Sequence, residues 1–330
     1  MNVVLAIATG VVLVWVLTNV KTSRPDGELI ARLPSYRRLL TAIMPTRNEA
    51  VVYYDDYVKA DALLEYIDKA RKRFAVDITH CLVAAAAVGL VSAPRMNQFV
   101  SGMRLYRRNE RTITFSMKRK KLDRKAKLSA VKLDMAGGET FEQLCTRING
   151  CIDRERSGKK TAIDREYDIF NLLPRPLLRF FVRLLRWLDD ANLLPGMFIK
   201  GDGMYTSMFI ANLGSLGMKP GYHHLYEWGN CPLFMMAGRV EERPAVVDGQ
   251  VVAQKTLHIR WSYDERIDDG LNSRYGMDAV RRVLENPYTY LGCLHPDGTD
   301  SRALDQPVDD APEHAAAPMS AATQASPAAN

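Results

Sequence analysis

The sequence predicts an α/β protein, a mixed sheet with helices packed against it, preceded by one transmembrane helix. Three observations lead to this fold class. Helical and strand patterns follow one another without the regular alternation of a doubly wound fold. Apolar residues make up 47% of the 330 residues, enough for a sizeable core. The chain also opens on a run without charged residues, from Val3 to Val20.

This opening run is close to the minimum length for crossing a bilayer, which takes about 17–25 residues. We interpret residues 1–20 as an anchor and residues 21–44 as a juxtamembrane connector, although a cleaved signal peptide or a buried helix are alternatives. Positive charge exceeds negative charge after the run, which places the main domain on the cytoplasmic side. The expected location is therefore the inner or plasma membrane, with a single pass.

Residues 45–298 have the patterns of one domain, and residues 299–330 have the Ala, Pro and Ser content of a disordered tail. Asp248 and Gly249 are typical of a tight hairpin turn, and Thr140 is a candidate helix cap. Helical spacing occurs at 59–74, 77–94, 140–156 and 272–287, and strand patterns occur at 51–58, 99–109, 111–120, 126–135, 204–214 and 233–264.

Several classes of function are disfavoured by the sequence. There is no G-x-G-x-x-G after a strand and no Walker loop, so nucleotide binding is not expected. The five cysteines are scattered and no His/Cys pairs have ligand spacing, so we expect free thiols and no metal. The net charge of +7 suits nucleic acid or an anionic surface. The basic run at 118–127 favours a solvated hairpin or a lipid-facing patch, and no nucleic-acid partner is expected.

An amphipathic segment at about 166–200 separates two strand regions. Four arginines three or four residues apart form a stripe on the predicted helix, and a tryptophan lies beside it. This composition suits contact with membrane lipid, although a helix packed on its own domain with a solvated arginine face is an equal alternative. The predicted membrane-contacting residues are Arg175, Arg179, Arg183, Arg186 and Trp187.

Four stretches, in order, resemble a known family. They are "PRMNQFVSGMRLYRR", "FIANLGSLGM", "PLFMMAGRVEERPAVVDGQVV" and "WSYDERIDDG". They are similar to the catalytic domain of the acyltransferase component of 2-oxoacid dehydrogenase complexes. This resemblance implies a chloramphenicol acetyltransferase-like fold and a homotrimer with sites between subunits. It also implies coenzyme A or acyl-CoA as a substrate. No lipoyl domain is recognised before the domain, so no lipoyl group is expected.

The resemblance also indicates which positions carry the family's chemistry. The family's proton-accepting histidine falls on Glu265, and its oxyanion-stabilising serine falls on Ala211. The family's motif aspartate, a scaffold residue, falls on Asp269, and Asn212 matches the asparagine after the serine. A glutamate with an ordinary pKa near 4.3 is a poor match for a thiol near 8.5, and loss of an oxyanion donor costs about 10²–10³ in rate.

Three functions remain open from the sequence. The first is a degenerate active site that binds acyl-CoA, a lipid or a partner, or that holds a trimeric scaffold. The second is an active transferase that uses Glu265 on a hydrophobic acceptor, and the third is an assembly protein without a ligand. Ser215 is a candidate displaced oxyanion donor. Two histidines, His223 and His224, are expected in an exposed loop. His258 is expected to pack or pair on its strand, and His80 is expected in the core or as a helix cap.

Overall fold

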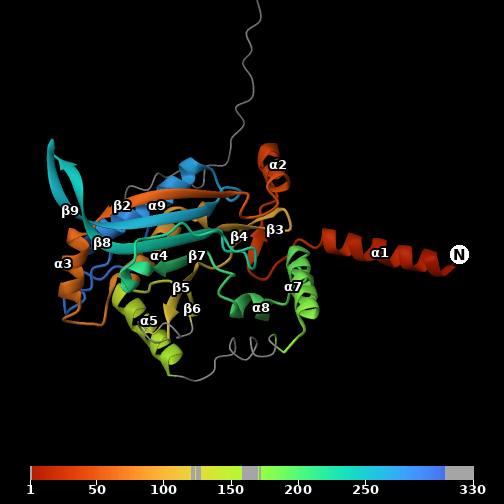
Figure 1. Cartoon of the computed structure of the whole chain (residues 1–330), viewed down its shortest axis with the longest axis horizontal. Helices are drawn as coiled ribbons and strands as arrows, with labels where there is room; N and C mark the ends of the chain where they lie inside the picture. The colour runs from red at the N-terminus through yellow and green to blue at the C-terminus, as the bar shows by residue number, and fades with distance from the viewer. Residues whose placement is uncertain (1, 120–122, 124–127, 158–169, 171, 309–330) are drawn as a thin grey trace, which may run out of the picture.

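The computed structural model describes residues 2–119, 123, 128–157, 170 and 172–308. Its main feature is a six-stranded sheet with the strand order β2-β9-β8-β7-β5-β6 (Figure 1). β7 is parallel to β5 and β8, whereas the other neighbours are antiparallel, so the mixed sheet predicted from the sequence is confirmed. The strands are β2 (Val51–Lys59), β5 (Thr112–Lys118), β6 (Leu128–Asp134), β7 (Met208–Asn212), β8 (Leu233–Val247) and β9 (Gln250–Asp264).

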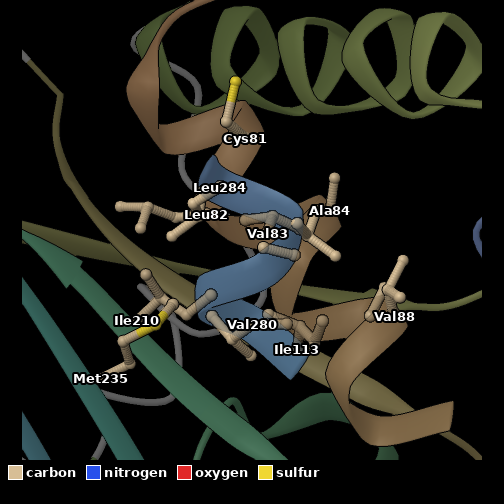
Figure 2. Close-up of a cluster of buried hydrophobic side chains, with 14 of the residues drawn as sticks. Cys81, Leu82, Val83, Ala84, Val88, Ile113, Ile210, Met235, Val280 and Leu284 are labelled. Carbon is tan, nitrogen blue, oxygen red and sulfur yellow. The ribbon is translucent and has the colours of Figure 1, made fainter. Parts of the chain in front are cut away.

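Helices pack on one face of this sheet. Leu82 and Val83 from α4 meet Val280 and Leu284 from α9, and together they cover sheet residues such as Ile210 (Figure 2). α4 is apolar on nearly all sides because it lies in this core, as its sequence predicted. The helices concerned are α3 (Asp61–Ala70), α4 (Ile78–Ser92), α5 (Phe141–Arg156) and α9 (Gly270–Glu285).

Local signals in the sequence account for several of the element boundaries. Asp77 and His80 form a capping box at the start of α4, so His80 is a cap residue with its ring buried. Thr140 forms a second capping box with Gln143 on α5. Asp248 and Gly249 have φ of 51° and 78°, the conformation of a type I′ turn, and they join β8 to β9 in a long hairpin.

A smaller antiparallel sheet has the order β1-β4-β3. It consists of β1 (Gly27–Leu29), β3 (Gln98–Ser101) and β4 (Arg104–Arg108). Residues 21–44, expected to be a connector, therefore contribute a strand to the domain, and α2 (Ser35–Ile43) follows it. The remaining helices are α7 (Arg175–Asp190), α8 (Gly196–Gly201) and α10 (Pro287–Tyr290), with short 3₁₀ helices η1 (Pro94–Asn97) and η2 (Leu213–Leu216).

The predicted transmembrane span is wrong. The amino-terminal helix α1 (Asn2–Val20) projects from the domain (Figure 1). No helix among the described residues is long and apolar enough to cross a membrane. This finding overturns the predicted single-pass location in the inner or plasma membrane.

Part of the segment predicted to be a disordered tail is folded. Leu304 and Val308 are buried, and Ala303 forms a β-bridge with Thr140. Residues 299–308 are therefore packed on the domain, because they place two apolar side chains in its core. Residues 309–330 lie outside the described part of the chain, as does most of the basic run at 118–127.

Candidate functional site

The turn after β9 is built around a buried ion pair. Arg266 donates from Nε and Nη2 to both carboxylate oxygens of Asp264, at 2.8 and 2.7 Å. The Arg266 guanidinium also donates to the carbonyls of Met44 and Pro45. Both side chains are almost fully buried. Arg266 therefore pairs with Asp264, and within the ranges that the structure describes it forms no ion pair with its neighbour Glu265.

The two following aspartates also hold the turn. Asp268 accepts from Arg37 at 3.0 Å, and burial raises the pKa of this carboxyl. Asp269 is the N-cap of α9, where its side chain accepts from the backbone N–H of Asn272 at 3.0 Å. Asp269 thus fixes the start of a helix. This geometry is that of a scaffold residue, the role implied by the resemblance.

Glu265 differs from these neighbours. Its backbone N–H donates to the carbonyl of Ala50 at 3.0 Å, which fixes the backbone at the end of β9. The side chain is half-buried, and within the described part of the chain its carboxylate forms no ion pair. Nearby, burial and then the charges of Glu265 and Asp269 raise the pKa of the Tyr263 hydroxyl. The turn therefore presents one carboxylate without an ion pair among the described residues.

Ala211 and Asn212 end strand β7. Ala211 is buried on the sheet face away from α4, in a cluster with Phe209 and Phe234. Asn212 points to the other side, where its amide donates to the Thr79 hydroxyl at 3.1 Å. Asn212 also accepts from the N–H of Ser215 and so caps η2.

Ser215 does not take over the role of an oxyanion donor in this arrangement. Its hydroxyl donates to the carbonyl of Asn212 at 2.8 Å. The hydroxyl is therefore used within η2.

Within one chain, Glu265 and Ala211 lie far apart. Ala211 pairs with Met236, and Met236 pairs with Arg260, so these three residues form a row across the sheet. Glu265 lies five residues beyond Arg260. At about 3.3 Å per residue and 4.8 Å per strand, the two positions are roughly 19 Å apart. A site that uses both positions must take them from different copies of the chain.

The row through Ala211 contains a hydroxyl that our sequence analysis missed. β5 runs parallel to β7 with Phe115 opposite Ile210, so Ser116 lies next to Ala211, about 4.8 Å away across the strands. Phe115 and Met117 point to the helices, and Ser116 therefore points to the same face as Ala211. Ser116 is half-buried. Period-two alternation identifies its face, but the parallel pairing with a strand far along the chain is not visible in the sequence.

The other end of this row is a polar cluster. Asp55 accepts from Nε2 of His258 at 2.7 Å and from Nε of Arg260 at 2.8 Å, and it also accepts from the Tyr222 hydroxyl. Burial acts to raise the pKa of Asp55, but the three hydrogen bonds outweigh it and bring the pKa to about 2. His258 is buried and paired, as expected from its strand position.

Of the two loop histidines, His223 is less exposed than the sequence suggested. The ring of His223 stacks on Phe234 with the centroids 4.1 Å apart, and burial lowers the pKa of this imidazole. The carbonyl of His223 accepts from the Ser262 hydroxyl. His224 is exposed and stacks on His223. His223 thus packs on the sheet face that points away from α4, against the ring of Phe234.

Helix α7 packs on the domain through two leucines of one side. Leu185 and Leu188 pack on a small cluster formed by Leu194, Ile199 and Tyr205. The predicted membrane-contacting residues Arg175, Arg179, Arg183, Arg186 and Trp187 are exposed. Phe180 and Phe181 are exposed on the same helix, so both the packed helix with a solvated arginine face and the lipid-contacting helix stay predictions.

Comparison with known proteins defines the class of this fold and of its carboxyl-terminal region. Residues 202–292 match the family model "2-oxoacid dehydrogenases acyltransferase (catalytic domain)". The chain is similar to a probable dihydrolipoamide acetyltransferase from Listeria monocytogenes, with a TM-score of 0.52 and 14% identity over 79% of this chain and 95% of that one. A truncated 2-oxoacid dehydrogenase catalytic core from Thermoplasma acidophilum gives a TM-score of 0.51 and 15% identity, over 79% and 99% of the two chains.

Sequence relatives match over shorter segments. The lipoamide acyltransferase component of the branched-chain alpha-keto acid dehydrogenase complex of Pseudomonas putida is 40% identical over 60 residues, which is 18% of this chain and 14% of that protein. The dihydrolipoyllysine-residue acetyltransferase component of the pyruvate dehydrogenase complex of Staphylococcus aureus is 38% identical over 54 residues, 16% of this chain and 13% of that protein. The chain thus spans less than a sixth of these relatives.

The resemblance predicted from the sequence is therefore confirmed. The fold is that of the acyltransferase cores of 2-oxoacid dehydrogenase complexes. The region that matches the family model includes both Ala211 and Glu265. The assignment of these two residues to the family's serine and histidine positions stays a prediction.

Proposed function

We propose that the protein is an acyltransferase that uses acyl-CoA and acts as a homotrimer, with Glu265 as the general base. The observation that carries this proposal is the free carboxylate of Glu265. It stands where the resemblance places the family's base, in a turn whose other carboxylates all have partners. The roughly 19 Å between Glu265 and Ala211 in one chain supports a site shared between two copies.

In this mechanism Glu265 accepts the proton of an acceptor thiol or hydroxyl as that group attacks the acyl carbonyl of the thioester. The new bond to the carbonyl carbon forms, and the carbon–sulfur bond to coenzyme A then breaks. The leaving thiolate takes the proton from Glu265, which returns the carboxylate to its starting state. General base catalysis of this type contributes about 10²–10⁴-fold.

The carbonyl oxygen gains negative charge during this step and needs a donor. Ala211 carries a methyl group there, whereas the Ser116 hydroxyl lies one strand away on the same face. We assign the donor role to Ser116 of the neighbouring copy.

A second candidate function is binding of acyl-CoA without turnover. It is favoured by the methyl group of Ala211, since loss of an oxyanion donor costs about 10²–10³ in rate. In this case the trimer would hold its ligand or act as a scaffold, and substitution of Glu265 would leave ligand affinity nearly unchanged.

Two measurements on the purified full chain test the proposal. The first is acyl transfer from a panel of acyl-CoAs to dithiol and long-chain alcohol acceptors, with Glu265→Gln as the test variant. Glu242→Gln is the matched control, since Glu242 is exposed on the β8–β9 hairpin. The second is the mass in solution, expected to be three times 37.2 kDa. Saturable acyl-CoA binding without any turnover would favour the second candidate, and a monomer would exclude the shared site.

A further inference from the structure

A cavity of about 340 Å³ lies where the end of α7 meets the domain. Its size is at the lower end of the range for small-molecule sites, about 300–1,000 Å³. α7 contributes the Arg186 and Trp187 side chains, the 226–229 loop contributes Trp228, and the inner wall includes Arg47. The α7 wall comes from the amphipathic segment at about 166–200, so the cavity depends on this segment.

The end of α7 packs closely against the backbone at Gly102. Gly102 has φ 53°, and a Cβ at this position would lie 2.1 Å from the carbonyl oxygen of Asp190. Arg24 donates to the Asp189 carboxylate at 2.8 Å and to the Ser101 hydroxyl at 2.6 Å. The cavity wall is therefore held in place by buried polar contacts.

Arg47 is the feature that points to a ligand. It is only 8% exposed, and its guanidinium donates to the carbonyls of Tyr226 at 3.1 Å and Val100 at 3.4 Å. An arginine side chain has five N–H donors, so these two bonds do not use all of them, and Arg47 lines the cavity. Among the described residues no carboxylate lies within ion-pair distance of it. Burial, together with the nearby charge of Arg266, lowers the pKa of Arg47, although the carboxylates of Asp264, Glu227 and Asp189 act against this shift.

The acidic residues around the cavity already have partners. Asp189 is paired with Arg24, and Asp190 accepts from the backbone N–H of Gly102 at 3.3 Å. Glu227 accepts from the backbone N–H groups of Arg47 and Asn48 and from the Asn48 amide. Arg186 at the cavity mouth is exposed and forms no ion pair within the described ranges. Arg47, Arg104 and Arg186 line the cavity and form no ion pair within the described ranges, so their positive charge has no paired carboxylate.

We propose that this cavity binds a small oxyanion-bearing molecule, with its carboxylate or phosphate group on Arg47. A planar oxyanion group matches the fork of a guanidinium. Arg186 adds a second charge at the mouth, and Trp187 and Trp228 provide aromatic wall for the remainder of the molecule. The inference does not rest on the proposed acyl transfer.

Titration of the full chain tests this proposal, with tryptophan fluorescence and calorimetry as readouts. The probes are inorganic phosphate, succinate and the neutral analogue succinamide. We expect saturable binding of phosphate or succinate at least tenfold tighter than that of succinamide, and the tighter of the two anions identifies the class of oxyanion. No saturable anion binding, or equal affinity for succinamide, overturns the proposal.

Amino-acid substitutions test whether the probe binds in this cavity. Arg47→Met should weaken anion binding at least tenfold, and Arg186→Gln about threefold. Arg183→Gln is the matched control, since Arg183 is exposed on the same helix and does not line the cavity. If Arg47→Met does not fold, Arg186→Gln decides the question. Equal affinities of Arg186→Gln, Arg183→Gln and the unmodified protein overturn the site.

Discussion

Arg24 and Asp189, 165 residues apart in the chain, form a buried ion pair at 2.8 Å. Arg24 also pairs with Asp26 at 2.9 Å and lies over the rings of Phe99 and Tyr106. The pair joins the segment after α1 to the end of α7. Residues expected to be a membrane connector are thereby part of the folded domain.

This pair leads to a stability prediction. Asp189→Ala should lower the free energy of unfolding by about 3–5 kcal/mol, because the Arg24 guanidinium loses a buried partner. The double substitution Arg24→Met with Asp189→Leu should recover much of this loss. Chemical denaturation measures both changes. Asp190→Asn, on an exposed neighbour, is the control and should change stability by less than about 0.5 kcal/mol. Equal effects of Asp189→Ala and the control would mean that the pair does not hold α7.

The Asp55 cluster predicts a pH dependence. The folded-state pKa of Asp55, about 2, lies below the ordinary aspartate value. Its contribution to stability is therefore present above about pH 4 and is lost as the pH falls toward 2. Because the side chain is 31% exposed, we expect only about 1 kcal/mol. Asp55→Asn should flatten acid denaturation in this window, whereas Asp153→Asn, on the exposed side of α5, should not. Identical acid curves for Asp55→Asn and the unmodified protein would contradict this account.

The position of Ser116 gives a prediction about catalysis. Ser116→Ala should lower the turnover number for acyl transfer about 10²-fold with little change in KM, since the hydroxyl is assigned to the transition state alone. Ser215→Ala is the control, because the hydroxyl of Ser215 is bonded within η2. Steady-state kinetics decide between them. A larger loss with Ser215→Ala than with Ser116→Ala would refute the assignment.

The sequence predicted much of the fold through local patterns. Alternation located the strands, Asp248 and Gly249 located the hairpin turn, and Thr140 marked the start of α5. The candidate site was harder to predict from the sequence, because Ser116 and Ala211 become neighbours only through a parallel pairing of strands 95 residues apart (211 minus 116). The amino-terminal run suggested a membrane span because its residues are uncharged and apolar, whereas no helix among the described residues is long and apolar enough to cross a membrane.

The central claim, acyl transfer with Glu265 as base, is tested most directly by acyl-CoA turnover of Glu265→Gln beside the unmodified protein. The account predicts that the unmodified protein transfers the acyl group and that Glu265→Gln lowers the rate by about 10²-fold or more. Combining Glu265→His with Ala211→Ser should raise the rate, because it supplies both groups used by the family. Rapid transfer by the unmodified protein that survives Glu265→Gln unchanged would contradict the account and place the chemistry elsewhere.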